Sequence, residues 1–168
     1  MKSSPRPSEK SGSLRKISLN RLGLLVDVET SIRMAGVRQK DTSAEQVVRS
    51  LLTRLGHSFR KSNRDLPGSP DVANRSRLWA VFVHGCFWHR HAGCSRTTTP
   101  KRNRAFWETK FDQNRRRDAR ALAALRRLGY RTVVVWECEI TKRPEIVERK
   151  LVKRLGSAPR QSARKRDA

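Results

Sequence analysis

The clearest pattern of apolar and polar positions lies between residues 41 and 56, in the stretch "DTSAEQVVRSLLTRLG". Apolar residues recur there every three or four positions, which is typical of an amphipathic helix with one buried face. The residues that share this face are Ala44, Val47, Val48, Leu51, Leu52 and Leu55. Thr42, followed three residues later by Glu45, has the pattern of a capping box, and Gly56 is a suitable helix terminator. We therefore expect a helix between Thr42 and Gly56.

Two short runs, residues 79–83 and 133–136, are apolar at every position. Such runs are typical of central strands that are buried on both faces. The stretch between them, residues 103–129, predicts one long helix, and residues 144–156 predict a final helix with Pro144 in its first turn. A helix between two strands favours a crossover connection, so the pattern indicates a layered α/β domain.

One face of the predicted long helix combines polar and apolar side chains. Trp107, Asn114 and Asp118 share this face with Leu122 and Leu125. Polar residues that continue an inward face suggest a functional site at one end of the domain. The alternative is that Asp118 forms an ion pair with a nearby surface arginine.

The two ends of the chain lack this periodicity and are rich in basic residues. Residues 1–25 contain mainly Ser, Pro, Lys and Arg, and residues 156–168 are similar. We expect a disordered basic N-terminal arm, one folded domain over residues 26–155, and a basic C-terminal tail.

The net charge of the chain then indicates which class of molecule the protein binds. The chain has 39 Lys and Arg against 15 Asp and Glu, a formal net charge of +24. This excess favours a polyanionic partner, most simply nucleic acid. A basic tail on a neutral domain fits less well, because the cations occur throughout the chain. An anionic membrane surface is another candidate, but no apolar run is long enough to span a membrane or act as a signal peptide. We expect a soluble, cytosolic protein without a membrane partner.

The segment "HGCFWHRHAGC", residues 84–94, concentrates histidine and cysteine in one place. Cys86, His91 and Cys94 have the spacing of metal ligands, and Cys138 lies just beyond the second predicted strand. Three thiolates and one imidazole would form a closed, tetrahedral, structural Zn²⁺ site. The odd number of cysteines in a reducing compartment disfavours a disulfide framework. Unrelated buried thiols and a surface histidine are the alternative.

Two further residues are candidates for catalysis. Asp71 ends the rigid turn "DLPGSPD", before the first predicted strand, and such a carboxylate can hold Mg²⁺. It could equally be an ordinary turn residue that bonds the backbone. His89 lies between two predicted zinc ligands, and a histidine with a pKa near neutrality can act as a general base. A simple hydrogen bond to the backbone is the alternative for His89.

These motifs together resemble a known family. "DTSAE", "LPGSPD", "VFVHGCFWHRH", "FWETK" and "VVWECE" occur in the order and spacing of the very short patch repair (Vsr) endonucleases, over residues 31–139. The resemblance implies a restriction-endonuclease-like fold, with a central mixed sheet flanked by helices and a structural zinc site. It also implies an enzyme that nicks one strand beside the thymine of T:G mismatches, which arise when 5-methylcytosine deaminates.

The resemblance assigns roles to the candidate catalytic residues. It implies that Asp71 binds the catalytic Mg²⁺ together with the backbone carbonyl of Val83. His89 is then the base that activates the attacking water, and His84 contacts a neighbouring phosphate or water. The acidic positions around the site match Glu45 and Asp118.

The remaining roles that the resemblance implies concern zinc and DNA. The zinc ligands match Cys86, His91, Cys94 and Cys138. Phe87, Trp88 and Trp107 match an aromatic wedge that enters the duplex, where an aromatic side chain can replace lost base stacking. Core packing is the common alternative for such aromatics.

Some positions depart from the family pattern. Val72 stands where an aromatic residue usually follows the aspartate, and Tyr130 replaces a tryptophan. Ala92 and Gly93 lengthen the loop between the zinc ligands relative to some members, and the basic arm is additional. None of these changes removes a catalytic side chain.

The sequence thus predicts a monomeric bacterial enzyme that acts on double-stranded DNA, with mismatch-repair proteins as further partners and a place at the nucleoid. A zinc-stabilised DNA-binding protein without catalysis is the main alternative. A basic RNA-binding protein of ribosomal type is a third hypothesis, which the compact, catalytic-looking segment disfavours.

Overall fold

The computed structural model describes residues 17–19, 25–27 and 41–156, in two compact units, residues 1–37 and 38–168. In the first unit, strand β1 (Ile17–Leu19) pairs antiparallel with β2 (Leu25–Asp27). The predicted basic arm and tail otherwise fall outside the described residues.

The second unit is built on a mixed sheet with the strand order β3-β4-β5-β6. Its strands are β3 (Arg60–Lys61), β4 (Val72–Asn74), β5 (Trp79–His84) and β6 (Arg131–Trp136). The first three pair antiparallel, and β5 pairs with β6 in parallel. Helix α4 (Arg104–Arg127) connects the parallel pair, as the predicted crossover requires. The predicted α/β class and long helix are therefore confirmed.

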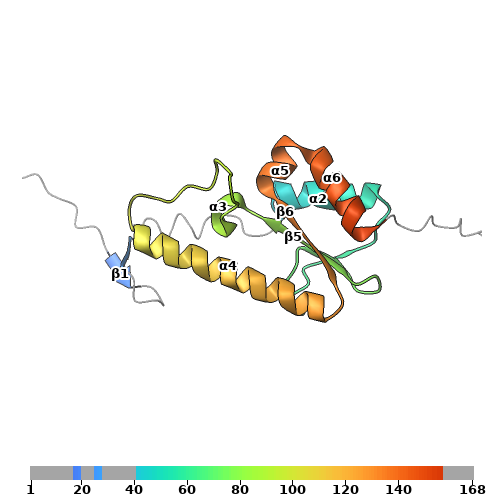
Figure 1. Ribbon diagram of the computed structural model, residues 1–168, viewed down its shortest axis with the longest axis horizontal. Coiled ribbons are helices and arrows are strands. Elements are labelled where there is room, and N and C mark those ends of the chain that lie inside the picture. The colour runs from blue at the N-terminus through green and yellow to red at the C-terminus, as the bar shows by residue number, and fades with distance from the viewer. Residues whose placement is uncertain (1–16, 20–24, 28–40, 157–168) are drawn as a thin grey trace, which may run out of the picture. The chain divides into compact units, whose positions relative to one another are not determined.

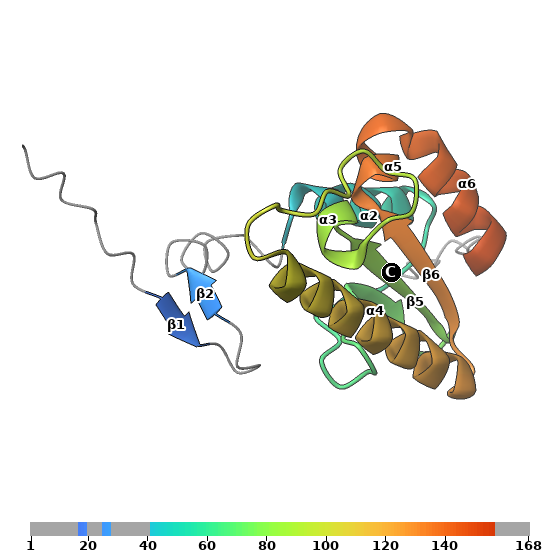
Figure 2. The ribbon, with the colours of Figure 1, turned by 60° about the vertical axis from the view of Figure 1, so that its left-hand side comes forward.

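Helices cover both faces of this sheet. One side carries α2 (Ser43–Arg54), α5 (Glu137–Lys142) and α6 (Pro144–Leu155), and the other carries α4 (Figures 1 and 2). Alternate residues of β5 supply the two cores, because successive side chains of a strand point to opposite faces. Trp79 and Val81 pack with α2 and α6, whereas Ala80 and Phe82 pack with Leu125 of α4.

The first predicted helix is confirmed together with its cap. Thr42 is the N-cap of α2 and its Oγ1 accepts a hydrogen bond from the backbone N–H of Glu45 at 3.3 Å. Gly56 follows with a φ of 77°, which favours glycine. Val47 was wrongly placed on the buried face, because its side chain is 40% exposed. It lies at the edge of the apolar stripe.

Only one of the two predicted strands has the expected position in the sheet. β5 lies between β4 and β6, so its prediction as a central strand is confirmed. β6 was also predicted to be central, and this is wrong, because β6 is an edge strand. Helices cover both faces of β6 and account for its apolar residues, but no strand pairs with its outer edge within the described residues. No helix among these residues is long and apolar enough to cross a membrane.

Candidate active site and metal centre

The ends of β5 and β6 bring distant segments together. In the parallel register, His84 lies opposite Trp136. The short helix α3 (Cys86–His89) begins after β5, and α5 begins directly after β6. The histidine- and cysteine-rich segment and Cys138 therefore both follow the C-terminal ends of these two neighbouring strands.

The four predicted zinc ligands lie together near these strand ends. One donor atom from each of Cys86, His91, Cys94 and Cys138 lies within 4.8 Å of the other three. Nδ1 of His91 is 3.2 Å from Sγ of Cys138 and 3.8 Å from Sγ of Cys86. Three sulfur atoms and one imidazole nitrogen form the donor set that tetrahedral zinc prefers, so this group could hold a metal ion.

Local contacts fix this ligand loop. The hydroxyl of Thr97 donates to the carbonyl of His91 at 2.8 Å, and the His91 ring stacks on Trp136 with centroids 4.2 Å apart. Burial raises the pKa of the Cys86 thiol to about 12. A bound cation would have to stabilise Cys86 as a thiolate, as metal ions do when they displace the proton of a thiol.

A histidine–aspartate pair lies next to this loop. Nδ1 of His89 is hydrogen-bonded to the carboxylate of Asp118, which α4 supplies. The two side chains are only 18% and 16% exposed. Burial opposes ionisation of Asp118, but the hydrogen bond to His89 and the neighbouring positive charges outweigh it and lower its pKa. The ionised carboxylate accepts the proton of Nδ1, which leaves Nε2 of a neutral His89 ring as a free base.

His84 packs directly against this pair. Its ring stacks on His89, with centroids 3.9 Å apart and planes 11° from parallel. Burial and the neighbouring His89 lower the pKa of His84 to about 4, so His84 is neutral near pH 7. His84, His89 and Asp118 also form a compact group that could hold a metal ion. Two imidazoles suit zinc or iron better than magnesium, which prefers oxygen ligands.

Helix α4 forms hydrogen bonds to two successive residues of α3, Trp88 and His89. Nδ2 of Asn114 donates to the carbonyl of Trp88 at 3.1 Å, and Asp118, one turn later, bonds His89. The sequence placed Asn114 and Asp118 on one inward face, but it did not identify their partners on α3. The alternative that Asp118 pairs only with a surface arginine is wrong, although Arg117 lies 3.6 Å away.

Asp71 lies beside the middle of the sheet. It precedes β4, and the antiparallel pairing brings it next to β5, where the N–H of Val83 donates to its Oδ2 at 2.7 Å. Burial raises the pKa of Asp71 to about 6 despite this hydrogen bond, and the negative charge of Glu45 adds to the increase. In a strand, the N–H and C=O of a residue point to the same side, so the carbonyl of Val83 also faces Asp71.

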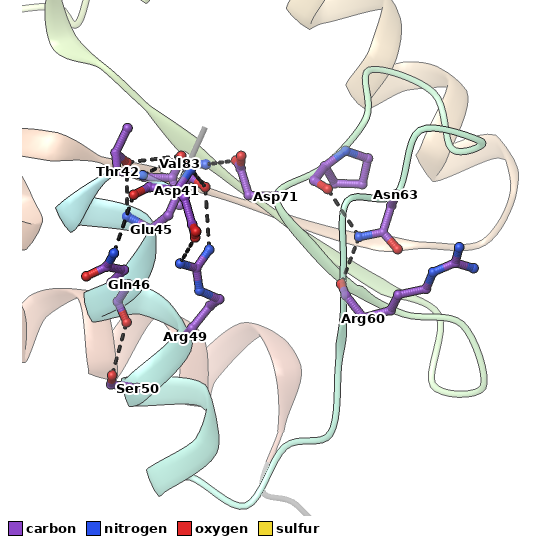
Figure 3. A network of polar contacts seen from close by, with 11 residues as sticks. Asp41, Thr42, Glu45, Gln46, Arg49, Ser50, Arg60, Asn63, Asp71 and Val83 are labelled. Carbon is purple, nitrogen blue, oxygen red and sulfur yellow. Dashed lines mark hydrogen bonds and ion pairs between the residues drawn. The ribbon is translucent and has the colours of Figure 1, made fainter. Parts of the chain in front are cut away.

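Glu45 performs its predicted capping role near Asp71 (Figure 3). Its carboxylate accepts hydrogen bonds from the hydroxyl of Thr42 at 3.0 Å and from the N–H of Asp41 at 3.0 Å. Arg49 forms ion pairs with Glu45 and Asp41. The charge of Glu45 acts on Asp71, whereas its oxygen atoms are engaged by the helix cap.

The three predicted wedge residues form one aromatic cluster. Phe87 lies 5.1 Å from Trp88 and 5.5 Å from Trp107, measured between ring centroids. A wedge that enters DNA needs exposed rings, but Phe87 and Trp88 are half-buried and Trp107 is only 4% exposed. The cause is the helix α4, whose first turns pack Trp107 and Phe111 against α3. Trp107 would have to leave this cluster to enter DNA.

Comparisons with known proteins identify the family. The model of the family described as "DNA mismatch endonuclease Vsr" matches residues 25–96. The type II nicking enzyme V.XorIIP of Xanthomonas oryzae is 48% identical over 108 residues, which are 64% of this chain and 79% of that relative. The DNA mismatch endonuclease Vsr of Escherichia coli is 37% identical over 125 residues, 74% of this chain and 80% of the relative. The type II nicking enzyme V.NmeAIP of Neisseria meningitidis is 35% identical over 119 residues, 71% and 84% of the two chains. The chain therefore belongs to the family of Vsr DNA mismatch endonucleases.

Proposed function

We propose that this protein is a Mg²⁺-dependent endonuclease that nicks one strand of duplex DNA beside the thymine of a T:G mismatch. The observation that carries the proposal is the hydrogen-bonded pair of His89 and Asp118, held near the half-buried carboxylate of Asp71. The mixed sheet with helices on both faces supports a restriction-endonuclease-like fold.

Asp71 and the backbone carbonyl of Val83 would hold the catalytic Mg²⁺. Both offer oxygen atoms, which Mg²⁺ prefers, and burial of Asp71 leaves a carboxylate whose negative charge is poorly compensated by the protein. When bound there, the ion would stabilise negative charge on the phosphate and lower the pKa of a bound water. Glu45 adds negative charge nearby while it caps α2.

His89 would act as the general base. Its Nε2 accepts a proton from the attacking water while the water oxygen bonds to phosphorus and the bond from phosphorus to one sugar oxygen breaks. Asp118 holds the Nδ1 proton and stabilises the charged imidazole that results. His84, which is neutral, would donate a hydrogen bond to a phosphate oxygen or a water.

The group of Cys86, His91, Cys94 and Cys138 would hold a structural Zn²⁺. With all four positions taken by protein ligands, it would bind no substrate. It would instead tie the start of α3 and the loop after α3 to α5, and so fix the position of His89.

Recognition of the mismatch would use the aromatic cluster. Phe87 and Trp88 lie on α3 between Cys86 and His89, so an opening of the cluster would place them near the reacting phosphate. A T:G pair is more easily opened than a matched pair, which favours insertion at the mismatch. Trp107 would complete the wedge only after it leaves its buried position.

The basic arm and tail would bind DNA phosphates. We expect a monomer that acts on bacterial DNA at the nucleoid and hands the nick to repair proteins.

A duplex with a single T:G pair and a different dye on each strand tests this function. With Mg²⁺, the protein should cut the thymine strand only, and a matched duplex should remain intact. Binding of the T:G duplex without any cut would instead support the zinc-stabilised, non-catalytic DNA-binding protein.

A further inference from the structure

A basic groove lies along the open edge of β6, at the end of the strand remote from Trp136. It has a volume of about 690 Å³. It is lined by residues 130–134, by Arg126 of α4, and by Lys150, Lys153 and Arg154 of α6. The end of α4 forms one wall and α6 forms the other, because these helices cover opposite faces of the sheet.

The charged residues that line this groove are all basic, and one of them, Lys150, forms an ion pair with Glu139 at 2.8 Å. Five of its lining residues are Lys or Arg and none is Asp or Glu. Arg126 donates to the hydroxyl of Thr132 at 3.2 Å, and Arg131 donates to the carbonyl of Leu155 at 3.1 Å. Neither interaction neutralises a charge. The side chains of Lys153 and Arg154 are exposed and have no hydrogen-bond or ion-pair partner among the residues that the structure describes.

The strand edge also offers backbone groups to this groove. The N–H of Arg131 donates towards Leu78, on the side of β5. The carbonyl of Val134 accepts a hydrogen bond from Lys150, and the N–H of Trp136 donates to Glu139, so these two residues face away from β5. Because the direction alternates along a strand, the N–H and C=O of Thr132 and the N–H of Val134 face the groove.

We propose that this edge is a docking site for an extended acidic segment of a partner protein, which adds a strand beside β6. Such a segment offers both N–H and C=O groups to the free edge, and its carboxylates would meet the cations of α4 and α6. Nucleic acid fits less well, because phosphates only accept hydrogen bonds and leave the carbonyl of Thr132 unpaired. The terminal regions of this chain are basic and do not match the groove.

The groove and the candidate active site lie at opposite ends of β6. The candidate active site lies where β5 and β6 end, at His84 and Trp136. The groove is lined by residues at the other end of β6, from Tyr130 to Val134. Docking therefore leaves the residues of the nuclease site free, and changes in the groove should not alter nicking.

The test uses the full-length protein and a fluorescent peptide of alternating glutamate and valine. Binding is measured by fluorescence anisotropy, with a lysine–valine peptide and a peptide methylated on alternate backbone nitrogens as probes of charge and strand pairing. Thr132→Pro removes an edge N–H at a position where proline is compatible with an edge strand. Thr132→Ala is its control, because it loses the same hydroxyl but keeps the N–H.

A second pair of variants tests the charge. Arg154→Glu reverses a cation of the groove, and Arg149→Glu makes the same charge change at an exposed position of α6 outside it. We expect about tenfold weaker binding of the acidic peptide for Thr132→Pro and for Arg154→Glu. Both control variants should bind like the unchanged protein, and all four should nick DNA normally.

Two results would overturn the proposal. If the methylated and unmethylated acidic peptides bind equally, the attraction is electrostatic only and no strand is added. If Arg154→Glu weakens DNA binding but has no effect on the peptide, the groove binds nucleic acid. The methylated peptide keeps the test valid even if Thr132→Pro fails to fold.

Discussion

His89 and Asp118 are 29 residues apart in the chain, yet Nδ1 of the histidine is hydrogen-bonded to the carboxylate of the aspartate. The imidazole reaches the site on α3 and the carboxylate on α4. This bond selects the tautomer of His89 whose Nε2 can accept a proton. The pair therefore joins the segment of residues 84–94 to the long helix α4.

Asp118→Asn should remove most of the nicking activity without unfolding the protein at about pH 7. An amide can donate a hydrogen bond to Nδ1, which would place the ring proton on Nε2 and abolish the free base. We expect the single-turnover nicking rate to fall by about 10²–10⁴-fold. Asp112→Asn is the matched control, because Asp112 lies on the exposed face of α4 and pairs with Arg115. Equal rates for the two variants would refute the role of Asp118.

Asp71→Asn should abolish nicking but stabilise the protein in the absence of divalent ions. The folded state holds the Asp71 proton more tightly than the unfolded chain between pH 3.8 and about 6. The free energy of unfolding therefore falls as the pH rises through this window and stays lower above it. Asn removes this loss, so the variant should be more stable by about 2–3 kcal/mol at about pH 7, from a shift of roughly two pKa units.

The pH dependence of this gain identifies its cause. Chemical denaturation should show that the advantage of Asp71→Asn disappears as the pH falls below 4, roughly the pKa of the unfolded carboxyl group. Asp118→Asn should behave in the opposite way, because the lowered pKa of Asp118 stabilises the fold above its unfolded pKa and this contribution is lost as the pH falls. A pH-independent gain for Asp71→Asn would contradict the assignment.

Cys138→Ser should release zinc and destabilise the domain. The purified protein should contain one Zn²⁺ per chain, and the variant should contain much less. We expect a stability loss of several kcal/mol, because metal binding is coupled to the folded arrangement of the ligands. Thr141→Ala on the same helix is the control, since the Thr141 hydroxyl bonds only the carbonyl of Glu137 among the residues that the structure describes. Full thermal stability of a zinc-free protein would exclude this role.

Trp88→Ala and Trp107→Ala should separate recognition from packing. Trp88 is half-buried, so its loss should weaken binding of a T:G duplex by about 10–100-fold, from a stacking contribution of 1–3 kcal/mol. Trp107 is buried, so its truncation should cost about 3–5 kcal/mol of folding stability. Melting temperature and affinity are measured on both variants. If Trp88→Ala lowers stability as much as Trp107→Ala and leaves the affinity of the folded fraction unchanged, Trp88 is a core residue.

Deletion of residues 1–16 should weaken binding to all DNA about equally. This segment contains five Lys and Arg and one Glu, and it ends before β1. Phosphate contacts carry no sequence information, so the affinity for T:G and matched duplexes should fall together and depend less steeply on salt. Titrations over a range of salt concentrations check this. A selective loss of mismatch preference would show that the arm reads the lesion.

The sequence predicted the elements whose residues follow a long or strong pattern. The capping box at Thr42, the periodicity of residues 43–54 and the apolar run of β5 all correspond to observed elements. The short strands β3 and β4 escaped prediction because two or three residues are too few for a visible alternation. The position of β6 at the edge of the sheet was also not predicted. Helices that cover both faces of an edge strand require the same run of apolar residues as a central strand has.

The candidate site was predictable in its residues but not in all its contacts. The metal-ligand spacing of residues 86–94 is local, so it is visible in the chain, and Cys138 follows from its place after a strand. The bond from Asn114 to Trp88 and the stacking of His84 on His89 depend on how α3 and α4 pack. The burial of Trp107 has the same origin, because it depends on a neighbouring helix that the local pattern does not reveal.

The parallel register of β5 and β6 also determines when, during synthesis, the four candidate metal ligands come together. During synthesis, residues 84–94 are made well before Cys138, and parallel pairing across a long crossover forms slowly. A slip by one residue would turn Trp136 and the start of α5 to the wrong face and separate Cys138 from the other three donors. An incomplete chain thus carries His89 and Asp71 without the support that fixes α3. If His89 and Asp71 act as proposed, nicking requires that β6 and α5 have first completed the fold.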